Sequence, residues 1–176
     1  MSDGTVFLFK QVYLSFELWS EVPQEISADE ETALQFASAC LRVENVAMAL
    51  AANAEQTMFG LSRKLEARGF AKDCVKAVVA RLMDQGIVND GRYSRLWLES
   101  RLFTKADSPR KLTAFLCNKG IDRKTVEHAL KTVLDRERER VLLKKYLEKL
   151  EKIGKGTERQ LLRREGFSYE VIEAEM

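Results

Sequence analysis

The chain contains few of the features that mark sheet proteins, secreted proteins or membrane proteins. Only two of its 176 residues are proline, and Leu, Ala, Lys, Glu and Arg are abundant, which favours an all-helical fold. Its longest apolar run, at about 46–52, is far too short to span a bilayer, and the amino terminus has no basic region followed by an apolar export segment. We therefore expect a cytoplasmic protein with no membrane contact.

Residues that commonly carry chemistry are also scarce. Cys40, Cys74 and Cys117 are odd in number and lack C-x-x-C spacing, so we interpret them as small apolar residues in a reducing compartment. The only histidine, His128, lies beside apolar helical positions and suits a flanking residue better than a general base. The chain has no Ser/His/Asp set, no metal-ligand spacing and no phosphate-binding glycine loop. We expect no catalytic residue, no metal and no cofactor, and hence a binding protein that is not an enzyme.

Positive charge is nearly absent from the first third of the chain. Residues 1–60 contain two basic and nine acidic side chains, a balance of about −7, whereas residues 61–176 contain twenty-seven basic and eighteen acidic ones, about +9. A basic body of this kind suits a polyanion or an acidic protein surface. Solvated helix faces alone give a milder version of the same pattern.

What the chain does contain is a short pattern that occurs three times. It reads L-E-A-R-G-F at 65–70, L-C-N-K-G-I at 116–121 and L-R-R-E-G-F at 162–167, so the copies are 51 and then 46 residues apart. Each copy combines a leucine on the last turn of one helix, a glycine suited to the left-handed cap, and an apolar residue that closes the cap. Recurrence at such a period indicates a repeat array in which neighbouring units share apolar surface.

Cap residues and apolar periodicity predict the helices. Ser27, with acids behind it, starts a helix to about residue 42, and a separate alanine-rich segment follows at about 44–55. Thr57, Asn89 and Ser108 are the caps expected for later helices, the last with proline in its first turn. A long charged helix is expected at about 136–153, where ordinary solvation is the simplest interpretation of the charges.

Residues 5–19 differ from the rest of the chain. Val12, Leu14, Phe16 and Leu18 alternate with polar neighbours, which is the period of a strand with one buried face. We expect a small hairpin or edge strand that packs on the helices or on a partner, because an isolated hairpin is marginal in water.

Together these patterns predict an all-α protein of tandem three-helix repeats in a curved array, with a small β-containing extension at the amino terminus. The expected boundaries are 1–43 for the extension, which carries strands and then a helix, 44–88 for the first repeat and 89–135 for the second. The third repeat, 136–176, is shorter, because its last helix has barely two turns.

Basic residues cluster around the helix ends and turns of the first two repeats. If the repeats stack with one face in common, these residues line it, and a row of phosphates or acidic side chains fits there. The rival interpretation is that each cation solvates its own helix, so the prediction concerns the set and not its single members. The candidate partner-binding residues are Lys64, Arg68, Arg92, Arg95, Arg101, Arg110, Lys111, Lys119, Arg123 and Lys124.

The order and spacing of several stretches resemble the RecX family, which regulates the bacterial recombinase RecA. The resemblance covers roughly 44–176 and is carried by R-K-L-E-A-R-G-F at 63–70, R-L-M-D-Q-G-I-V-N-D at 81–90, R-Y-S-R-L-W-L-E-S-R at 92–101, S-P-R-K-L at 108–112 and N-K-G-I-D at 118–122. One departure is Glu165, which stands where the other two repeats carry Arg68 and Lys119.

The resemblance implies a non-catalytic protein that docks along the groove of the RecA filament on single-stranded DNA. There it is expected to restrain ATP hydrolysis, strand exchange and RecA-promoted repressor cleavage, and so to act in recombination, DNA repair and the SOS response. We expect a monomer whose partners are the RecA filament and the DNA within it. One rival is a direct DNA-binding regulator, because three-helix units with a glycine turn resemble helix-turn-helix modules. A third possibility is a scaffold for some other protein, which predicts no affinity for RecA or DNA.

Overall fold

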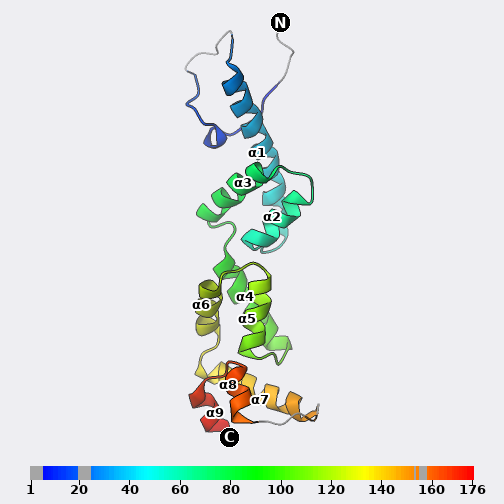
Figure 1. Ribbon diagram of the computed structural model, residues 1–176, viewed down its shortest axis with the longest axis vertical. Coiled ribbons are helices and arrows are strands. Elements are labelled where there is room, and N and C mark those ends of the chain that lie inside the picture. The colour runs from blue at the N-terminus through cyan, green and yellow to red at the C-terminus, as the bar shows by residue number, and fades with distance from the viewer. Residues whose placement is uncertain (1–5, 20–24, 153, 155–157) are drawn as a thin grey trace. The chain divides into compact units, whose positions relative to one another are not determined.

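The computed structural model describes residues 6–19, 25–152, 154 and 158–176. It divides the chain into two compact units, Met1–Val88 and Asn89–Met176, which are described separately below. Within the described residues the regular structure is entirely helical, with nine α-helices and one short 3₁₀-helix (Figure 1). The predicted all-α fold class is confirmed. The finer division of the chain into three repeats stays a prediction.

The first unit is built on α1 (Ala28–Asn53), α2 (Met58–Glu66) and α3 (Lys72–Asp84). Two of the predicted caps are present, since the hydroxyl of Ser27 accepts from the Glu30 amide in a capping box and that of Thr57 accepts from the Gly60 amide. The three helices enclose a core of small and branched side chains. Its most deeply buried members include Ala37, Cys40, Val43, Ala47, Leu61, Leu65, Val75, Val78 and Leu82.

The expected break between two helices near residue 43 is wrong, because α1 runs through it without interruption. Buried residues recur along α1 at helical spacing, from Leu34 through Val43 to Ala47. This single apolar stripe faces the core on both sides of the expected break, and no glycine or proline interrupts it. One long helix therefore buries the stripe with no exposed helix ends in the middle.

The strand expected at residues 5–19 is also wrong for the part that the structure describes, residues 6–19. These residues form no strand; their one regular element is the 3₁₀-helix η1 (Gln11–Tyr13), followed by a bend at 15–16. Val12 and Leu18, expected on the buried face, are exposed, whereas Tyr13 from the other face is buried. Residues 6–19 pair with no strand in the described part of the chain, so the contacts of their side chains determine how the segment packs.

Glu44 of α1 holds this amino-terminal segment in place. Its carboxylate is buried and accepts a hydrogen bond from the Tyr13 hydroxyl at 3.1 Å and one from the Lys10 ammonium at 2.8 Å. Arg81 of α3 lies 3.9 Å from the same carboxylate. Burial and the neighbouring Glu44 charge both raise the pKa of the Tyr13 phenol above its ordinary value.

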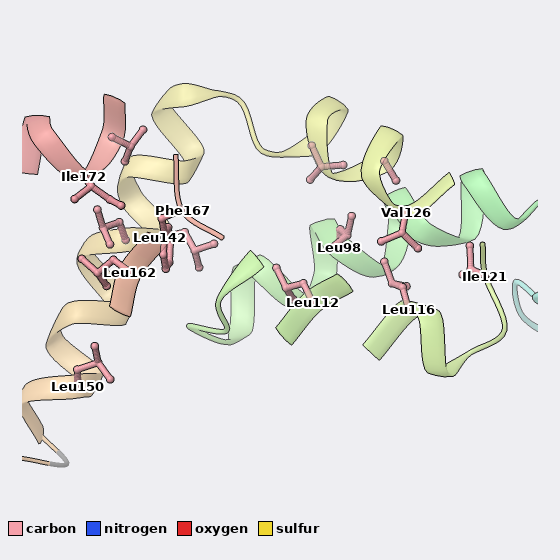
Figure 2. Close-up of a cluster of buried hydrophobic side chains, with 14 residues drawn as sticks. Leu98, Leu112, Leu116, Ile121, Val126, Leu142, Leu150, Leu162, Phe167 and Ile172 are labelled. Carbon is pink, nitrogen blue, oxygen red and sulfur yellow. The ribbon is translucent and has the colours of Figure 1, made fainter. Parts of the chain in front are cut away.

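The second unit contains α4 (Asp90–Thr104), α5 (Pro109–Asn118), α6 (Arg123–Val133), α7 (Arg136–Lys152), α8 (Arg159–Arg164) and α9 (Tyr169–Glu175). The side chains of Asn89, Ser108 and Asp122 accept from backbone amides at the starts of α4, α5 and α6. Figure 2 shows Leu98, Leu112, Leu116 and Val126 converging from the first three helices, and Leu142, Leu162, Phe167 and Ile172 converging from the last three with their turn.

The three copies of the leucine–glycine pattern form the same turn. Gly69, Gly120 and Gly166 have φ angles of 84°, 82° and 90°, the left-handed region that favours glycine. In each copy the amide of the apolar residue after the glycine donates to the carbonyl of the leucine, at 3.4, 3.4 and 3.2 Å. This is the helix-ending arrangement with a left-handed glycine. The predicted cap is confirmed in all three places.

The third copy is fastened to the start of α5. The Arg110 amide donates to the Glu165 carbonyl at 2.9 Å, and the Ser108 hydroxyl donates to the Glu165 carboxylate. A Cβ added at Gly166 would meet the Arg110 nitrogen and the Pro109 Cβ at 3.3 Å. Glu165 and the turn around it therefore serve packing between α5 and α8, which accounts for an acid where the other repeats carry a cation.

Candidate nucleic-acid and partner interface

The ten predicted cations are divided between the two units. Lys64 and Arg68 belong to the first unit and the other eight to the second. In the first unit the Lys64 ammonium donates to the Gln56 side-chain oxygen at 2.8 Å, and Arg68 donates to the Lys64 carbonyl at 2.7 Å. Both side chains contact their own segment, and both are exposed.

In the second unit, Arg92, Arg95 and Lys124 line one groove between α4 and α6. The groove has a volume of about 550 Å³ and is also lined by Asn89, Gly91, Thr125, His128, Ala129 and Thr132. A Cβ added at Gly91 would make only ordinary contact with the Thr125 methyl group, at 3.9 Å, but would lie 3.3 Å from the Asn89 side-chain oxygen, so glycine leaves room for that cap. The Arg92 amide donates to that same oxygen at 2.8 Å, which fixes the first turn of α4.

The electrostatics of this α4–α6 groove favour an anion. Its lining contains two guanidinium groups and one ammonium group and no carboxylate. Arg95 and Lys124 are exposed and form no ion pair within the part of the chain that the structure describes. Threonine hydroxyls and the amide of Asn89 add neutral hydrogen-bonding groups. Phosphates or carboxylates of a partner are the groups that this arrangement can hold.

Arg101 and Lys111 both pair with one buried acid of their own unit. Both contact the carboxylate of Asp107, which is buried, at 2.7 Å. Burial raises the pKa of a carboxyl group, but the hydrogen bonds from Lys111 and Arg101 outweigh it and hold the pKa of Asp107 below its ordinary value. These two cations stabilise the loop between α4 and α5, so they are weaker candidates for partner binding than Arg95 and Lys124.

Lys119 lies with Arg101 near a pair of stacked aromatic rings. Trp97 of α4 and Phe115 of α5 stack with centroids 4.7 Å apart and an interplanar angle of 13°. The Arg101 guanidinium is 5.8 Å from both rings, and the Lys119 ammonium is 5.7 Å from Phe115. The two cations thus lie beside the ring pair, and Phe115 remains partly exposed.

Arg110 and Arg123 line a second and larger groove, of about 820 Å³, between α5, α6 and the last three helices. Arg123 forms an ion pair with Glu127 at 2.8 Å, and Arg110 lies 4.0 Å from Glu165. The residues of α6 that line this groove lie about half a turn away from those that line the α4–α6 groove, so α6 separates the two. One shared face for all eight cations of this unit is therefore absent.

His128 and Cys40 occupy ordinary structural environments. His128 lies exposed on the α4–α6 groove, and within the described residues no group of three or more His, Cys, Asp or Glu side chains could hold a metal ion. Burial and the neighbouring Cys74 raise the pKa of Cys40 to about 12, so its thiol is protonated at neutral pH. Of the helices that the structure describes, none is long and apolar enough to cross a membrane.

Comparisons with known proteins identify the family. The model of the RecX second three-helix domain matches residues 89–130. The regulatory protein RecX of Treponema pallidum (strain Nichols) is 32% identical over 142 residues, which is 80% of this chain and 87% of that protein. This chain belongs to the RecX family. The regulatory protein RecX of Amycolatopsis mediterranei is 29% identical over 147 residues, which is 77% of this chain and 83% of its relative.

Solved RecX structures share the fold. A crystal structure of regulatory protein RecX superposes with a TM-score of 0.69 at 22% identity, covering 85% of this chain and 77% of the other. RecX from Lactobacillus salivarius gives a TM-score of 0.60 at 22% identity, covering 78% and 94%. The RecX domain match takes in α4, α5 and most of α6. Arg92, Arg95 and Lys124 therefore lie in the part of the chain that the RecX domain model covers.

Proposed function

We propose that this RecX-family protein is a non-catalytic regulator that binds the RecA filament on single-stranded DNA and inhibits its ATPase, strand-exchange and co-protease activities. The observation that carries the proposal is the α4–α6 groove, with three cations and no carboxylate in the family's second three-helix domain. In this proposal Arg95 and Lys124 contact acidic side chains of RecA or phosphates of the filament DNA. The acidic first sixty residues orient the molecule or limit its affinity for bare DNA without abolishing it.

The first test is DNA-dependent ATP hydrolysis by the cognate RecA on single-stranded DNA, with this protein titrated in. Binding of the protein to the same DNA without RecA is measured in parallel. We expect hydrolysis to fall at protein concentrations too low to coat the DNA. Unchanged hydrolysis at saturating protein would refute regulation of RecA by this chain.

A double charge reversal, Arg95→Glu with Lys124→Glu, tests the groove itself. An exposed ion pair contributes up to about 1 kcal/mol, so losing two and adding repulsion should raise the inhibitory concentration roughly tenfold or more. The dependence of inhibition on salt should weaken as well, because fewer charge contacts remain to be screened. Arg101 is left unchanged, since its pairing with Asp107 would confuse binding with stability.

Arg42→Glu with Lys76→Glu is the matched control, because both residues are exposed cations of the first unit and the net charge changes equally. The control variant should inhibit like the unmodified protein. If both double variants weaken inhibition to the same degree, net charge and not the groove is responsible, and the proposed contact surface is wrong.

A direct DNA-binding regulator is the second candidate. It is favoured by one feature, the two helices α5 and α6 joined by the tight glycine turn at Gly120, as in helix-turn-helix modules. That function predicts sequence-specific binding to duplex DNA in the absence of RecA. Tight duplex binding together with no effect on RecA would support it over filament regulation.

A further inference from the structure

Phe103, the penultimate residue of α4, is almost fully exposed to solvent. Its side chain is 88% exposed, the highest value among the large apolar side chains that the structure describes. A lone exposed apolar residue needs no explanation, but a bare aromatic ring costs free energy in water unless something covers it. The surroundings of Phe103 therefore indicate what it could bind.

Phe103 borders a groove dominated by lysine. The groove has a volume of about 420 Å³ and is lined by the end of α4, the loop after it and one side of α7. Its lining contains four ammonium groups and one carboxylate, that of Glu148. The four lysines are Lys105, Lys145, Lys149 and Lys152. None of them is among the cations that the sequence pattern singled out.

One of these lysines holds two segments of the protein together, and the other three are available to bind a partner. The Lys149 ammonium donates to the Ala106 carbonyl at 3.0 Å and lies 3.7 Å from Asp107, so it ties α7 to the loop. Lys105, Lys145 and Lys152 are exposed and form no ion pair among the described residues. Lys145, Lys149 and Lys152 follow each other at helical spacing and so lie on one face of α7.

Phe103 also borders a smaller groove, of about 290 Å³. Its lining combines the apolar Leu102, Leu142 and half-exposed Val141 with three charged side chains, Glu137, Arg138 and Lys145, the last of which is shared with the lysine groove. The apolar area around Phe103 is thus limited, while the cationic area is extended. A protein partner that buried the ring would also bury ammonium groups, which is costly unless each is paired.

We propose that Phe103 and the lysines around it form a binding groove for single-stranded nucleic acid. An unpaired base stacks on the Phe103 ring, and the ammonium groups of Lys105, Lys145 and Lys152 contact the phosphates on either side. An exposed aromatic ring within a cationic groove is the combination that single-strand-binding proteins use, because every base has a face that can stack. The biological setting of this groove rests on the proposed function, in which the protein meets single-stranded DNA, but its binding property is independent of RecA.

Fluorescence anisotropy with a labelled single-stranded oligothymidine and the full chain, without RecA, tests the groove. Stacking of one base on an aromatic side chain is commonly lost with a roughly five- to hundredfold drop in affinity on alanine substitution. We expect such a drop for Phe103→Ala, while Phe103→Trp keeps or increases the affinity. Phe103→Leu keeps an apolar side chain but removes the ring, so it should behave like alanine.

The matched control is Phe59→Ala, which removes an exposed phenylalanine of the first unit that lies 5.8 Å from Arg63 and does not line the lysine groove. It should leave the affinity unchanged. A triple change of Lys105, Lys145 and Lys152 to Gln should lower the slope of log affinity against log salt by about two, since each phosphate contact on a single strand contributes about 0.7. The same three changes to Arg keep the charge and should keep the slope.

The outcomes separate this proposal from the proposed function. If the unmodified protein inhibits RecA but Phe103→Ala binds the oligonucleotide as tightly as the unmodified protein, or neither binds it, the groove proposal is overturned while filament regulation stands. If oligonucleotide binding depends on Phe103 but RecA is unaffected, the groove stands and filament regulation fails. Loss of RecA binding in Phe103→Ala with unchanged oligonucleotide binding would make Phe103 an anchor for a protein, and would also overturn the proposal.

Discussion

The docking of the amino-terminal segment through Glu44 gives a prediction whose magnitude follows from the structure. Tyr13 donates to the buried Glu44 carboxylate, and a hydrogen bond to a charged group contributes about 1.5–3 kcal/mol. Tyr13→Phe keeps the ring in the core and removes only this bond. Release of the segment should therefore become roughly ten- to a hundredfold more frequent, since 1.4 kcal/mol is a factor of ten.

Native-state hydrogen exchange measures that release. The amides of Tyr13 and Leu14 donate to the carbonyls of Lys10 and Gln11 at 3.0 and 2.9 Å, so they exchange when the segment opens. Their exchange should accelerate by the same factor in Tyr13→Phe. Amides in the middle of α3, such as that of Val79, serve as the internal reference and should exchange as in the unmodified protein.

Lys10→Met provides the control, because the Lys10 side chain is 46% exposed and an ion pair of that kind contributes at most about 1 kcal/mol. It should accelerate exchange by no more than about fivefold. Equal exchange rates for Leu14 in Tyr13→Phe and in the unmodified protein would show that Glu44 does not hold the segment, and the reasoning would fail.

Three further predictions concern stability. Because the folded pKa of Tyr13 is raised, its contribution to stability is complete below the unfolded pKa of about 10 and is lost as the pH rises further. When tyrosinate formation is followed by absorbance against pH, Tyr13→Phe should therefore show one late-ionising tyrosine fewer than the unmodified protein. The folded pKa of Asp107 is lowered, so its contribution to stability is present above about pH 4 and is lost in acid. Asp107→Asn should lower the free energy of unfolding in urea at pH 7 by about 1–2 kcal/mol, toward the low end because Arg101 is partly exposed. The variant should also lose that acid dependence of stability. Gly166→Ala should destabilise the protein more than Gly69→Ala does. Both changes strain the backbone by about 1 kcal/mol, but only Gly166 lies against the backbone of a neighbouring segment. Equal changes in the melting temperatures of the two variants would contradict this.

Most of the short-range interactions, such as helix caps and turns, could be predicted from the sequence. The caps at Ser27, Thr57 and Ser108 depend on a side chain and an amide three residues away, so the pattern contains the whole interaction. The leucine–glycine turns are equally local, and all three formed as predicted. The strand expected around Val12 failed because alternation alone does not supply the neighbouring strand that a ladder needs.

The candidate site was predictable in composition but not in arrangement. The sequence alone places many cations in residues 89–124, but whether a cation is free depends on acids that are distant or hidden in the fold. Asp107 is buried and holds Arg101 and Lys111, whereas Arg95 and Lys124 meet across two helices. Lys145 and Lys152 belong to a helix whose charges looked like ordinary solvation.

The sequence by itself thus determined the helical class, the side-chain caps at Ser27, Thr57, Asn89 and Ser108, and the repeated glycine turns, because each cap and turn depends on residues within about one turn of one another. Only the tertiary structure decided which cations share a groove, that Tyr13 faces inward onto Glu44, and that Phe103 stays uncovered. These are contacts between segments far apart in the chain. Their geometry depends on how whole helices pack against one another, which a local sequence pattern does not determine.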